Sequence, residues 1–308
     1  MADSRRGFLL GVAAYAIWGL FPLYWPLLEP AGAVEILAHR VFWSLAVVIG
    51  LVLVARRTGQ LRAVLRSPRS RGILTVAAVV IAVNWGTYIW AVNNDHVVEA
   101  SLGYFINPLV TVLIGVLVLH ERLRTAQWAA LGVAAVAVLA LTIEYGHPPW
   151  VSLLLAFSFG TYGLAKKKAN VGAVESLTFE TMVLTPVAVG YIAWLVVSGS
   201  STFGHHGGGH ALLLAGTGIV TVIPLVCFGG AATRVSLTTI GLLQYITPTV
   251  QFILGVTVFA EPMPPMRWVG FVLIWLALAL FTGESLRHHR RQARQFRDLE
   301  RAAESAAL

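Results

Sequence analysis

Hydrophobic residues form long continuous runs along this chain, separated by short polar segments. A run of about 20 residues is long enough for an α-helix to cross the hydrocarbon core of a bilayer, which is about 30 Å thick. Backbone N–H and C=O groups in lipid must be paired inside a helix or a closed barrel, and continuous rather than alternating runs favour helices. The pattern therefore predicts an all-α membrane protein.

The runs predict ten transmembrane helices. The first run follows the segment MADSRR, but its length and the interruptions at Trp18, Pro22 and Trp25 favour a retained span over a cleaved signal peptide. The predicted spans cover residues 7–28, 33–55, 72–93, 98–119, 127–143, 150–165, 174–197, 211–231, 237–258 and 267–283.

Composition agrees with this class of protein. Of the 308 residues, 57% are hydrophobic and 12% are charged, and the mean hydropathy is +0.76. A soluble globular domain carries about 25% charged residues. The chain has a single cysteine, Cys227, which excludes an intramolecular disulfide.

The basic residues are distributed unevenly between the predicted loops. With the N-terminus inside, 20 of the 22 Lys and Arg residues fall on the cytoplasmic side, Arg267 falls at the outer edge of the last span, and Arg40 lies within the second. Such a split predicts a multi-pass protein of the cell membrane with both termini in the cytoplasm. The net charge of +8 is then a topology signal, so no nucleic-acid partner is expected, although the basic tail could contact anionic membrane lipids.

Two halves of the chain are similar at a constant offset of 140 residues. The tetrapeptide GAVE occurs at 32–35 and at 172–175, and INPLVTVLIGVLVLHERLRTAQW from Ile106 matches ITPTVQFILGVTVFAEPMPPMRW from Ile246, with Glu121 opposite Glu261. Five predicted spans separate equivalent positions, so the halves must face opposite ways across the membrane. Inverted repeats are typical of secondary transporters, whose similar halves can exchange conformations. The predicted organisation is a five-helix repeat at 1–143, an inverted five-helix repeat at 144–283 and a basic cytoplasmic tail at 284–308.

These features resemble a known family of membrane proteins. The five-plus-five arrangement with EILAHR in the second span resembles the EamA branch of the drug/metabolite transporter superfamily. The segments EASLGYFINPLVTVLIGVLVLHERL and LLQYITPTVQFILGVTVFAEP resemble its RarD subfamily, a group labelled for chloramphenicol sensitivity. The resemblance covers about residues 7–283. It implies a permease that moves small molecules through a central cavity between the halves, and it leaves the substrate open.

Three ionisable residues, Glu35, His39 and Arg40, lie near the start of the second span. A charge at a helix centre costs at least about 2.5–3.5 kcal/mol on insertion scales, so such residues usually face protein or water. Arg40 could fix the span against its neighbours, or it could form a cationic wall of the cavity for anionic or dipolar substrates. His39 could be a packed histidine or a proton relay, and Glu35, on the same helix face as His39, is a candidate for coupling or gating.

Other polar residues fall within the third and seventh spans. Glu180, the counterpart of Arg40 at the offset of 140, could couple transport to protons, or it could be a carboxylate near the cytoplasmic headgroups that is paired with a nearby Lys. Asn84 and Tyr88 share one helix face, and the counterpart of Asn84 is Pro224, which would kink the eighth span. Both features suit a binding site at the midplane, with Pro224 as a candidate gating residue, although Asn84 could instead bond to a neighbouring helix.

The fourth and ninth spans carry matched polar residues and prolines. Gln244, Thr247 and Gln251 form a polar stripe over two turns, which favours a cavity lining over contact between helices. A proline leaves the carbonyl four residues earlier without its amide partner. The predicted substrate-binding residues of these spans are Tyr104, Asn107, Gln244, Tyr245, Thr247 and Gln251. The predicted gating residues are Pro108 and Pro248.

Motifs of other function classes are missing from the sequence. There is no Walker, H-E-x-x-H or G-x-S-x-G motif, and the HHGGGH segment at 205–210 lacks rigid spacing, so we expect no cofactor and no metal site. An intramembrane enzyme acting on lipid would need groups that converge near one leaflet, and a scaffold would leave the polar stripe unexplained. We therefore predict a secondary-active permease, not an enzyme, that moves a metabolite or drug-like molecule by alternating access, with efflux as the expected direction.

Overall fold

The computed structural model of the chain is helical throughout its regular structure and describes residues 2–119, 123–235 and 237–306. Glu121 of the repeat comparison lies outside these residues. The long helices follow the predicted spans closely, because each continuous apolar run can pair its backbone groups only within itself. They are α1 (Ala2–Gly19), α2 (Ala33–Val54), α4 (Pro68–Asn93), α5 (Val97–Leu119), α6 (Thr125–Tyr145), α7 (Trp150–Ala169), α8 (Ala173–Val197), α9 (Gly207–Ala232), α11 (Ile246–Thr257) and α12 (Pro265–Ala306).

Eight of the described helices are long and apolar enough to cross a membrane, and a bent helix pair at the N-terminus would make nine. The predicted count of ten is therefore reproduced only in part. Helix α7, which corresponds to the span predicted at 150–165, is not among these helices, and its last turn carries three lysines. The chain is a multi-pass membrane protein in either count.

Two of the predicted spans are interrupted in the structure. The first bends by 41° after α1 and continues as two short 3-10 helices, η1 (Phe21–Leu23) and η2 (Trp25–Leu28), each with a proline in its first two positions. The ninth is interrupted at Gln244–Tyr245, between α10 (Leu237–Leu243) and α11, although residues 239–257 together still form one of the eight candidate spans. The hydropathy pattern does not reveal either break, because an apolar residue suits both a straight and a bent segment.

Two helical segments were not predicted. The loop between the second and third spans contains the short helix α3 (Thr58–Arg66). Helix α12 continues beyond residue 283, the predicted end of the last span, through the described part of the basic tail to Ala306. A search for apolar runs misses both segments because they are polar.

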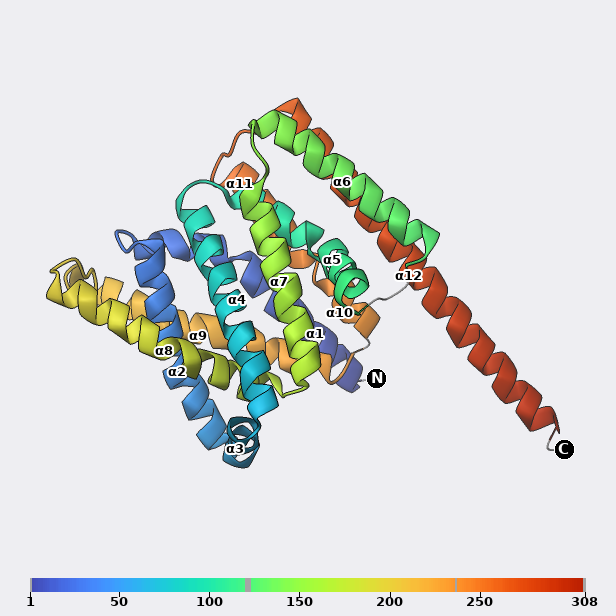
Figure 1. The fold of residues 1–308 in the computed structure, drawn as a ribbon, viewed down its shortest axis with the longest axis horizontal. Helices are drawn as coiled ribbons and strands as arrows, with labels where there is room; N and C mark the ends of the chain where they lie inside the picture. The colour runs from blue at the N-terminus through green and yellow to red at the C-terminus, as the bar shows by residue number, and fades with distance from the viewer. Residues whose placement is uncertain (1, 120–122, 236, 307–308) are drawn as a thin grey trace. The chain divides into compact units, whose positions relative to one another are not determined.

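The chain groups into two compact units, the first formed by residues 1–114 and 150–263 and the second by residues 115–149 and 264–308. Both units take residues from both predicted repeats, so the boundaries of the compact units do not coincide with those of the predicted repeats. In the first unit, α4 packs on α7, α2 packs on both α8 and α9, and α1 packs on α9 (Figure 1). Close approach requires glycine at Gly218, where an added Cβ would lie 2.5 Å from the Trp43 carbonyl carbon.

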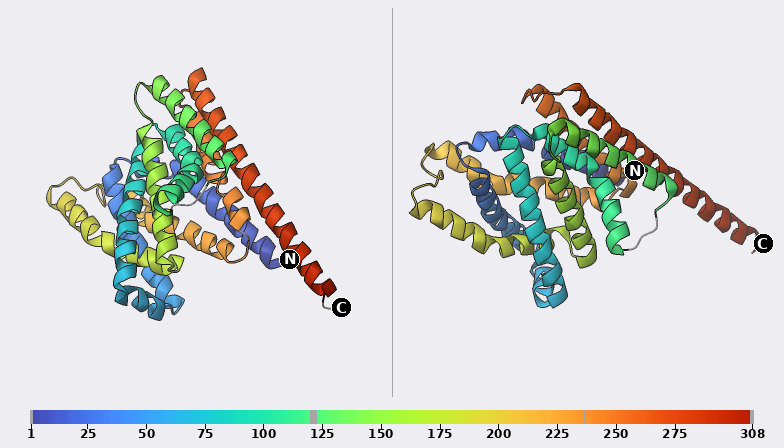
Figure 2. Two further views of the ribbon diagram at one scale, coloured as in Figure 1. Left: turned by 45° about the vertical axis from the view of Figure 1, so that its right-hand side comes forward. Right: turned by 45° about the horizontal axis from the view of Figure 1, so that its top comes forward.

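The second unit consists mainly of the α6–α12 pair, which lies side by side in both views of Figure 2. Gly270 of α12 packs directly on Leu141 of α6. Arg267 pairs with Glu144 at one end of the pair, at 3.7 Å, and Arg124 pairs with Glu284 at the other, at 3.4 Å.

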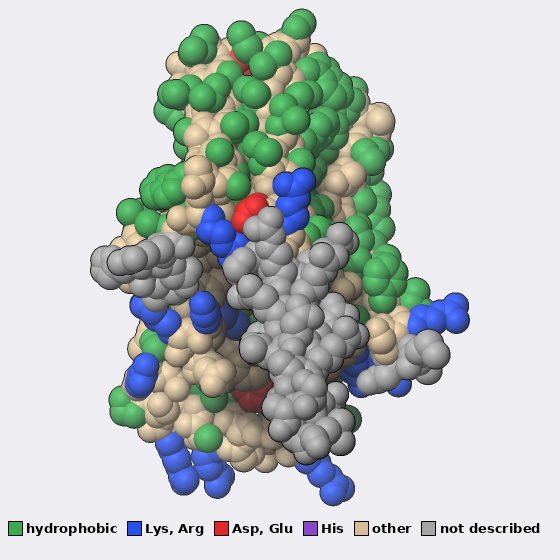
Figure 3. All heavy atoms as spheres, turned by 90° about the vertical axis from the view of Figure 1, so that its right-hand side faces the viewer, with side chains coloured by type: hydrophobic (Ala, Val, Ile, Leu, Met, Phe, Trp, Pro, Cys, Tyr) green, Lys and Arg blue, Asp and Glu red, His purple; other side chains and the backbone are tan. Residues whose placement is uncertain are grey.

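Hydrophobic side chains cover a large part of the molecular surface, as Figure 3 shows for one face. A soluble monomer rarely exposes an apolar area of this extent, whereas a surface in contact with lipid requires one. In the second unit the exposed large hydrophobic residues include Trp128, Val136, Leu139, Ile143, Val269, Val272, Leu276 and Leu280.

Candidate functional site

Arg40 lies inside the first unit, where its side chain is surrounded by aromatic rings. The residue is only 3% exposed. Its guanidinium carbon lies 4.0 Å from the ring centroid of Trp85, 5.2 Å from that of Trp25 and 5.6 Å from that of Phe21. Its Nε donates a hydrogen bond of 2.9 Å to Thr221 Oγ1 on α9. Arg40 therefore does connect α2 to a neighbouring helix, but through a hydroxyl rather than an acidic group.

Four of the predicted site residues form two hydrogen-bonded pairs close to Arg40, and the rings of Tyr88 and Tyr104 bring the pairs into contact. Asn84 donates to Leu155 O and Ser158 Oγ on α7, at 3.1 and 2.9 Å, and accepts a bond of 3.3 Å from the Tyr104 hydroxyl. Gln251 of α11 donates to the Tyr88 hydroxyl at 2.8 Å.

The rings of Tyr88 and Tyr104 meet edge to face, with 5.6 Å between their centroids. Both tyrosines interact electrostatically with Arg40. The structure thus brings together one cation, an amide from each predicted half and two tyrosines.

The predicted polar stripe of the ninth span is divided by the break between α10 and α11. Gln251 faces Tyr88, and its Oε1 is buried without a hydrogen-bond partner among the described residues. Thr247 instead donates to Tyr15 O at 2.7 Å and so bonds α11 to α1. Gln244 and Tyr245 form the break itself. One residue of the stripe, Gln251, therefore contacts the other predicted site residues, whereas Thr247 joins two helices.

The three prolines predicted for gating have different local settings. Pro108 lies inside α5 and Pro224 inside α9, whereas Pro248 lies in the first turn of α11. A first-turn proline displaces no hydrogen bond, since its N–H would have no partner within the helix. Asn107, next to Pro108, is buried, and its Oδ1 has no partner among the described residues.

At the N-terminal end of α2, Glu35 accepts a hydrogen bond of 2.8 Å from the backbone N–H of Thr202, in the segment after α8. Its hydrogen-bond partner is therefore neither His39 nor Arg40. His39 stacks on Phe203, with 4.9 Å between ring centroids, and neither of its ring nitrogens has a partner in the described part of the chain. His210, from the HHGGGH segment, contacts Leu28 O at 2.9 Å, and the described residues contain no cluster that could hold a metal.

At the N-terminal end of α8, two carboxylates have basic partners. Glu180 is 2.9 Å from Lys166 Nζ and accepts a hydrogen bond of 3.1 Å from the Tyr162 hydroxyl. This is the contact expected of a carboxylate paired with a nearby Lys. Glu175 pairs with Arg57, just after α2, at 3.2 Å. Sequence analysis did not select Glu175 or Arg57 as site residues, although the repeated GAVE tetrapeptide already marked Glu175 as the counterpart of Glu35.

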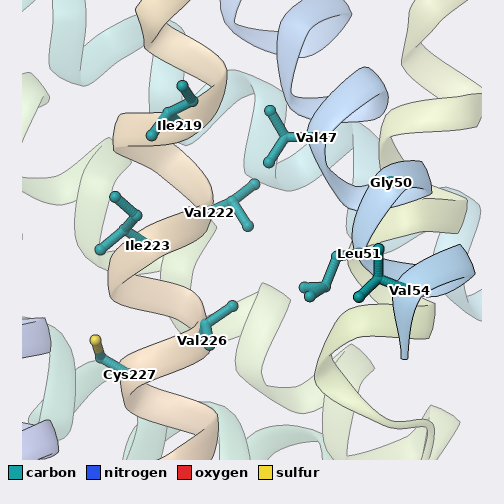
Figure 4. Close-up of a pocket in the computed structure, with 9 residues that line it drawn as sticks. All are labelled: Val47, Gly50, Leu51, Val54, Ile219, Val222, Ile223, Val226 and Cys227. Atoms are coloured by element: carbon teal, nitrogen blue, oxygen red, sulfur yellow. The ribbon is translucent and has the colours of Figure 1, made fainter.

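A pocket of about 410 Å³ lies between α2 and α9 (Figure 4). It contains none of the predicted site residues, and only apolar side chains and a glycine line it, together with the thiol of Cys227. Val222 belongs both to this lining and to a buried cluster that packs against Trp85. Val222 therefore lies between the pocket and Trp85, the ring that covers the Arg40 guanidinium. Its lining residues are Val47, Gly50, Leu51, Val54, Ile219, Val222, Ile223, Val226 and Cys227.

Comparison with known proteins gives consistent results. The sequence profile of the EamA-like transporter family matches residues 5–143 and 149–283. The chain is 64% identical over 290 residues to Protein RarD of Streptomyces exfoliatus, covering 94% of this chain and 92% of that protein. It is 43% identical over 290 residues to an uncharacterized transporter of Pseudomonas aeruginosa, covering 94% of this chain and 97% of that protein. One crystal structure shares the fold, with a TM-score of 0.58 and 20% identity, over 91% of this chain and 98% of that chain.

Proposed function

Because the chain belongs to the EamA-like transporter family, we propose that it is a secondary-active permease that moves a small organic molecule across the cell membrane by alternating access. We further propose efflux as the direction of transport. The observation that carries the proposal is the buried cluster around Arg40. It combines a cation, amides and aromatic rings within membrane-spanning helices, where polar groups usually mark a substrate pathway.

The helices that form this cluster come from both predicted repeats. Arg40, Asn84 and Tyr104 lie on α2, α4 and α5, and Thr221 and Gln251 lie on α9 and α11. A site formed jointly by two halves changes its access when the halves rearrange. We propose Arg40, Asn84, Tyr88, Tyr104 and Gln251 as substrate-binding residues, with Asn107 as a further one.

The packing of helices in the first unit supports the proposal of an inverted repeat. At the offset of 140, α1 corresponds to α7, α2 to α8, and α4 to α9. The pair α1–α9 then corresponds to α7–α4, and α2–α9 corresponds to α8–α4, and all four pairs are in contact. Glu35 and Glu175 occupy matched positions at the two ends of the α2–α8 pair, and we propose both as gating residues, together with Pro108 and Pro224.

Counterflow in proteoliposomes tests this function directly. Vesicles loaded with one unlabelled compound are diluted into the same compound carrying a radiolabel, for a set that includes chloramphenicol and small aromatic acids, amines and neutral amides. A permease accumulates the label of its own substrate only, and Gln251→Leu, which removes the donor to Tyr88, is expected to slow that exchange at least tenfold. The matched control is Arg62→Gln, an exposed residue of α3. Absence of exchange for every compound would contradict the proposal for this set.

Cysteine labelling tests the topology. In a Cys227→Ala background, a cysteine at Ser200, which is exposed after α8, should react with an impermeant maleimide in intact cells. A cysteine at Gly59, exposed on α3, should react only after the membrane is opened. The adjacent Ser201 is unsuitable as a reporter of sidedness because it is only 6% exposed. Reversed labelling would show that the termini lie outside.

A further inference from the structure

Arg40 is a buried cation whose hydrogen-bonding capacity is only partly used. Its Nε is bound by Thr221, whose own hydroxyl donates to Thr217 O at 2.8 Å. Its NH1 is buried and has no hydrogen-bond partner among the described residues. A guanidinium carries five N–H donors, and a buried donor left without a partner costs free energy. The chain alone therefore does not satisfy all the hydrogen-bond donors of Arg40.

The charge of Arg40 is also uncompensated. Within the described part of the chain, no carboxylate forms an ion pair with it, and the group that accepts a hydrogen bond from its Nε is the hydroxyl of Thr221. Elsewhere in the same unit, the partly buried Lys166 lies 2.9 Å from Glu180. Burying a charge without a counterion is strongly unfavourable. An anion from outside the chain would neutralise this charge and would explain why a cation is buried at this position.

The surroundings of Arg40 define the rest of the ligand. Trp85 covers the guanidinium at 4.0 Å, and Trp25 and Phe21 lie within 6 Å of it. Aromatic faces stabilise a desolvated guanidinium by cation–π interaction and also pack against planar apolar groups. The fork of the guanidinium matches a carboxylate, which it can bind with two parallel hydrogen bonds.

We infer that Arg40 is the docking point for the carboxylate of a substrate that carries a planar aromatic body. This inference rests on the permease proposed above. In the structure the guanidinium is almost fully enclosed, so the ligand reaches it only after the helices around it separate. The carboxylate then takes the place that no acidic side chain fills, and the aromatic body packs among Trp85, Trp25 and Phe21.

Three probes with the same ring but different charge test the inference. Benzoate, benzamide and benzylammonium are titrated at pH 7 into the purified full-length protein in detergent, and binding is followed by tryptophan fluorescence, because Trp85 and Trp25 adjoin the site. We expect benzoate to bind at least tenfold more tightly than benzamide, and benzylammonium to give no saturable response. Equal binding of benzoate and benzamide, or no saturable binding of benzoate, would overturn the inference.

Variants of the site separate the charge from the fork. Arg40→Gln should abolish the preference for benzoate, and Arg40→Lys, which keeps the charge without the planar fork, should weaken benzoate binding about tenfold. Thr221→Val leaves Arg40 in place but removes the acceptor that orients it, so a smaller loss of about threefold is expected. Arg62→Gln is the control with an unchanged preference. If Arg40→Gln does not fold, as judged by thermal unfolding and size-exclusion chromatography, the Lys and Val variants decide the outcome.

The same three probes distinguish this inference from the proposed function when they are used in counterflow. Arg40-dependent binding of benzoate without exchange of any compound would keep the inference and remove the permease proposal. Exchange of benzamide or another uncharged compound that is equal in wild type and Arg40→Gln would keep the permease and overturn the inference. Exchange of benzoate that is lost in Arg40→Gln supports both.

Discussion

The two ends of the α2–α8 pair carry the same four residues, Gly-Ala-Val-Glu, in different surroundings. At the first end, Gly32 precedes α2, and Glu35 holds the segment that follows α8. At the second end, Gly172 precedes α8, and Glu175 holds Arg57, which follows α2. Each glutamate therefore contacts a residue that follows the C-terminal end of the other helix. Two antiparallel helices related by a pseudo-twofold axis would form such a pair of contacts.

The contacts at the two ends differ in kind. The partner of Glu35 is a backbone N–H, in a segment whose residues Ser201 and Thr202 are buried. The partner of Glu175 is a guanidinium whose side chain is 47% exposed. A buried hydrogen bond to a charged acceptor is worth more than an ion pair with one exposed partner, and salt screens mainly the latter. Matched sequence positions therefore form contacts of unequal strength. If both glutamates act in gating as proposed, the Glu175 end should open more easily.

The largest effect is expected from removing the acceptor at the Glu35 end. Glu35→Ala leaves the Thr202 N–H buried without a partner, which should cost roughly 1–3 kcal/mol and release the segment after α8. A cysteine at Ser201, in the Cys227→Ala background, should then react with a thiol reagent at least tenfold faster than in the parent. Thermal unfolding of the purified protein provides the stability measurement.

Glu35→Gln is the matched control for this prediction. Its amide oxygen can still accept from Thr202 N, so labelling at Ser201 should stay within about threefold of the parent. If the Gln and Ala variants expose Ser201 equally, the carboxylate acts by its charge and not as a hydrogen-bond acceptor. If neither variant exposes it, Glu35 does not hold this segment.

A smaller and salt-dependent effect is expected at the Glu175 end. Arg57→Gln removes an ion pair in which the Arg57 side chain is 47% exposed and the Glu175 side chain is buried. Because solvent reaches one partner and weakens the pair, the melting temperature should fall by no more than a few degrees at low ionic strength. The difference from wild type should shrink in 0.5 M salt, because the Debye length then falls well below 10 Å. A difference that salt leaves unchanged would indicate that Arg57 contributes by packing and not by charge.

The smallest effect is expected from the glycines of the two tetrapeptides. A Cβ added at Gly172 would lie 2.2 Å from Glu175 Oε2, whereas one added at Gly32 would meet no atom within 4 Å. A carboxylate at the end of a flexible side chain can move away cheaply, so Gly172→Ala should have little effect on stability but should displace Glu175 from Arg57. The salt dependence of unfolding should therefore resemble that of Arg57→Gln, while Gly32→Ala should behave as wild type.

The helical membrane class, most helix positions and the similarity of the two halves could be predicted from the amino-acid sequence alone. These follow from properties that are local along the chain, since an apolar run of about 20 residues must pair its own backbone groups in lipid. The sequence also predicts Arg40, Asn84, Tyr88, Tyr104 and Gln251 as candidate site residues, because polar residues within apolar runs are conspicuous. It did not reveal the break at Gln244–Tyr245, which leaves no mark in hydropathy.

The partner of each of these residues, in contrast, depends on how the helices pack in three dimensions. Thr202 is 167 residues from Glu35, and Thr221 is 181 residues from Arg40. Periodicity cannot predict contacts over such separations, because they depend on how the helices pack. The two GAVE segments make this clearest: a backbone amide reaches the carboxylate in one, and the guanidinium of Arg57 reaches it in the other, because different segments of chain pass the two helix ends.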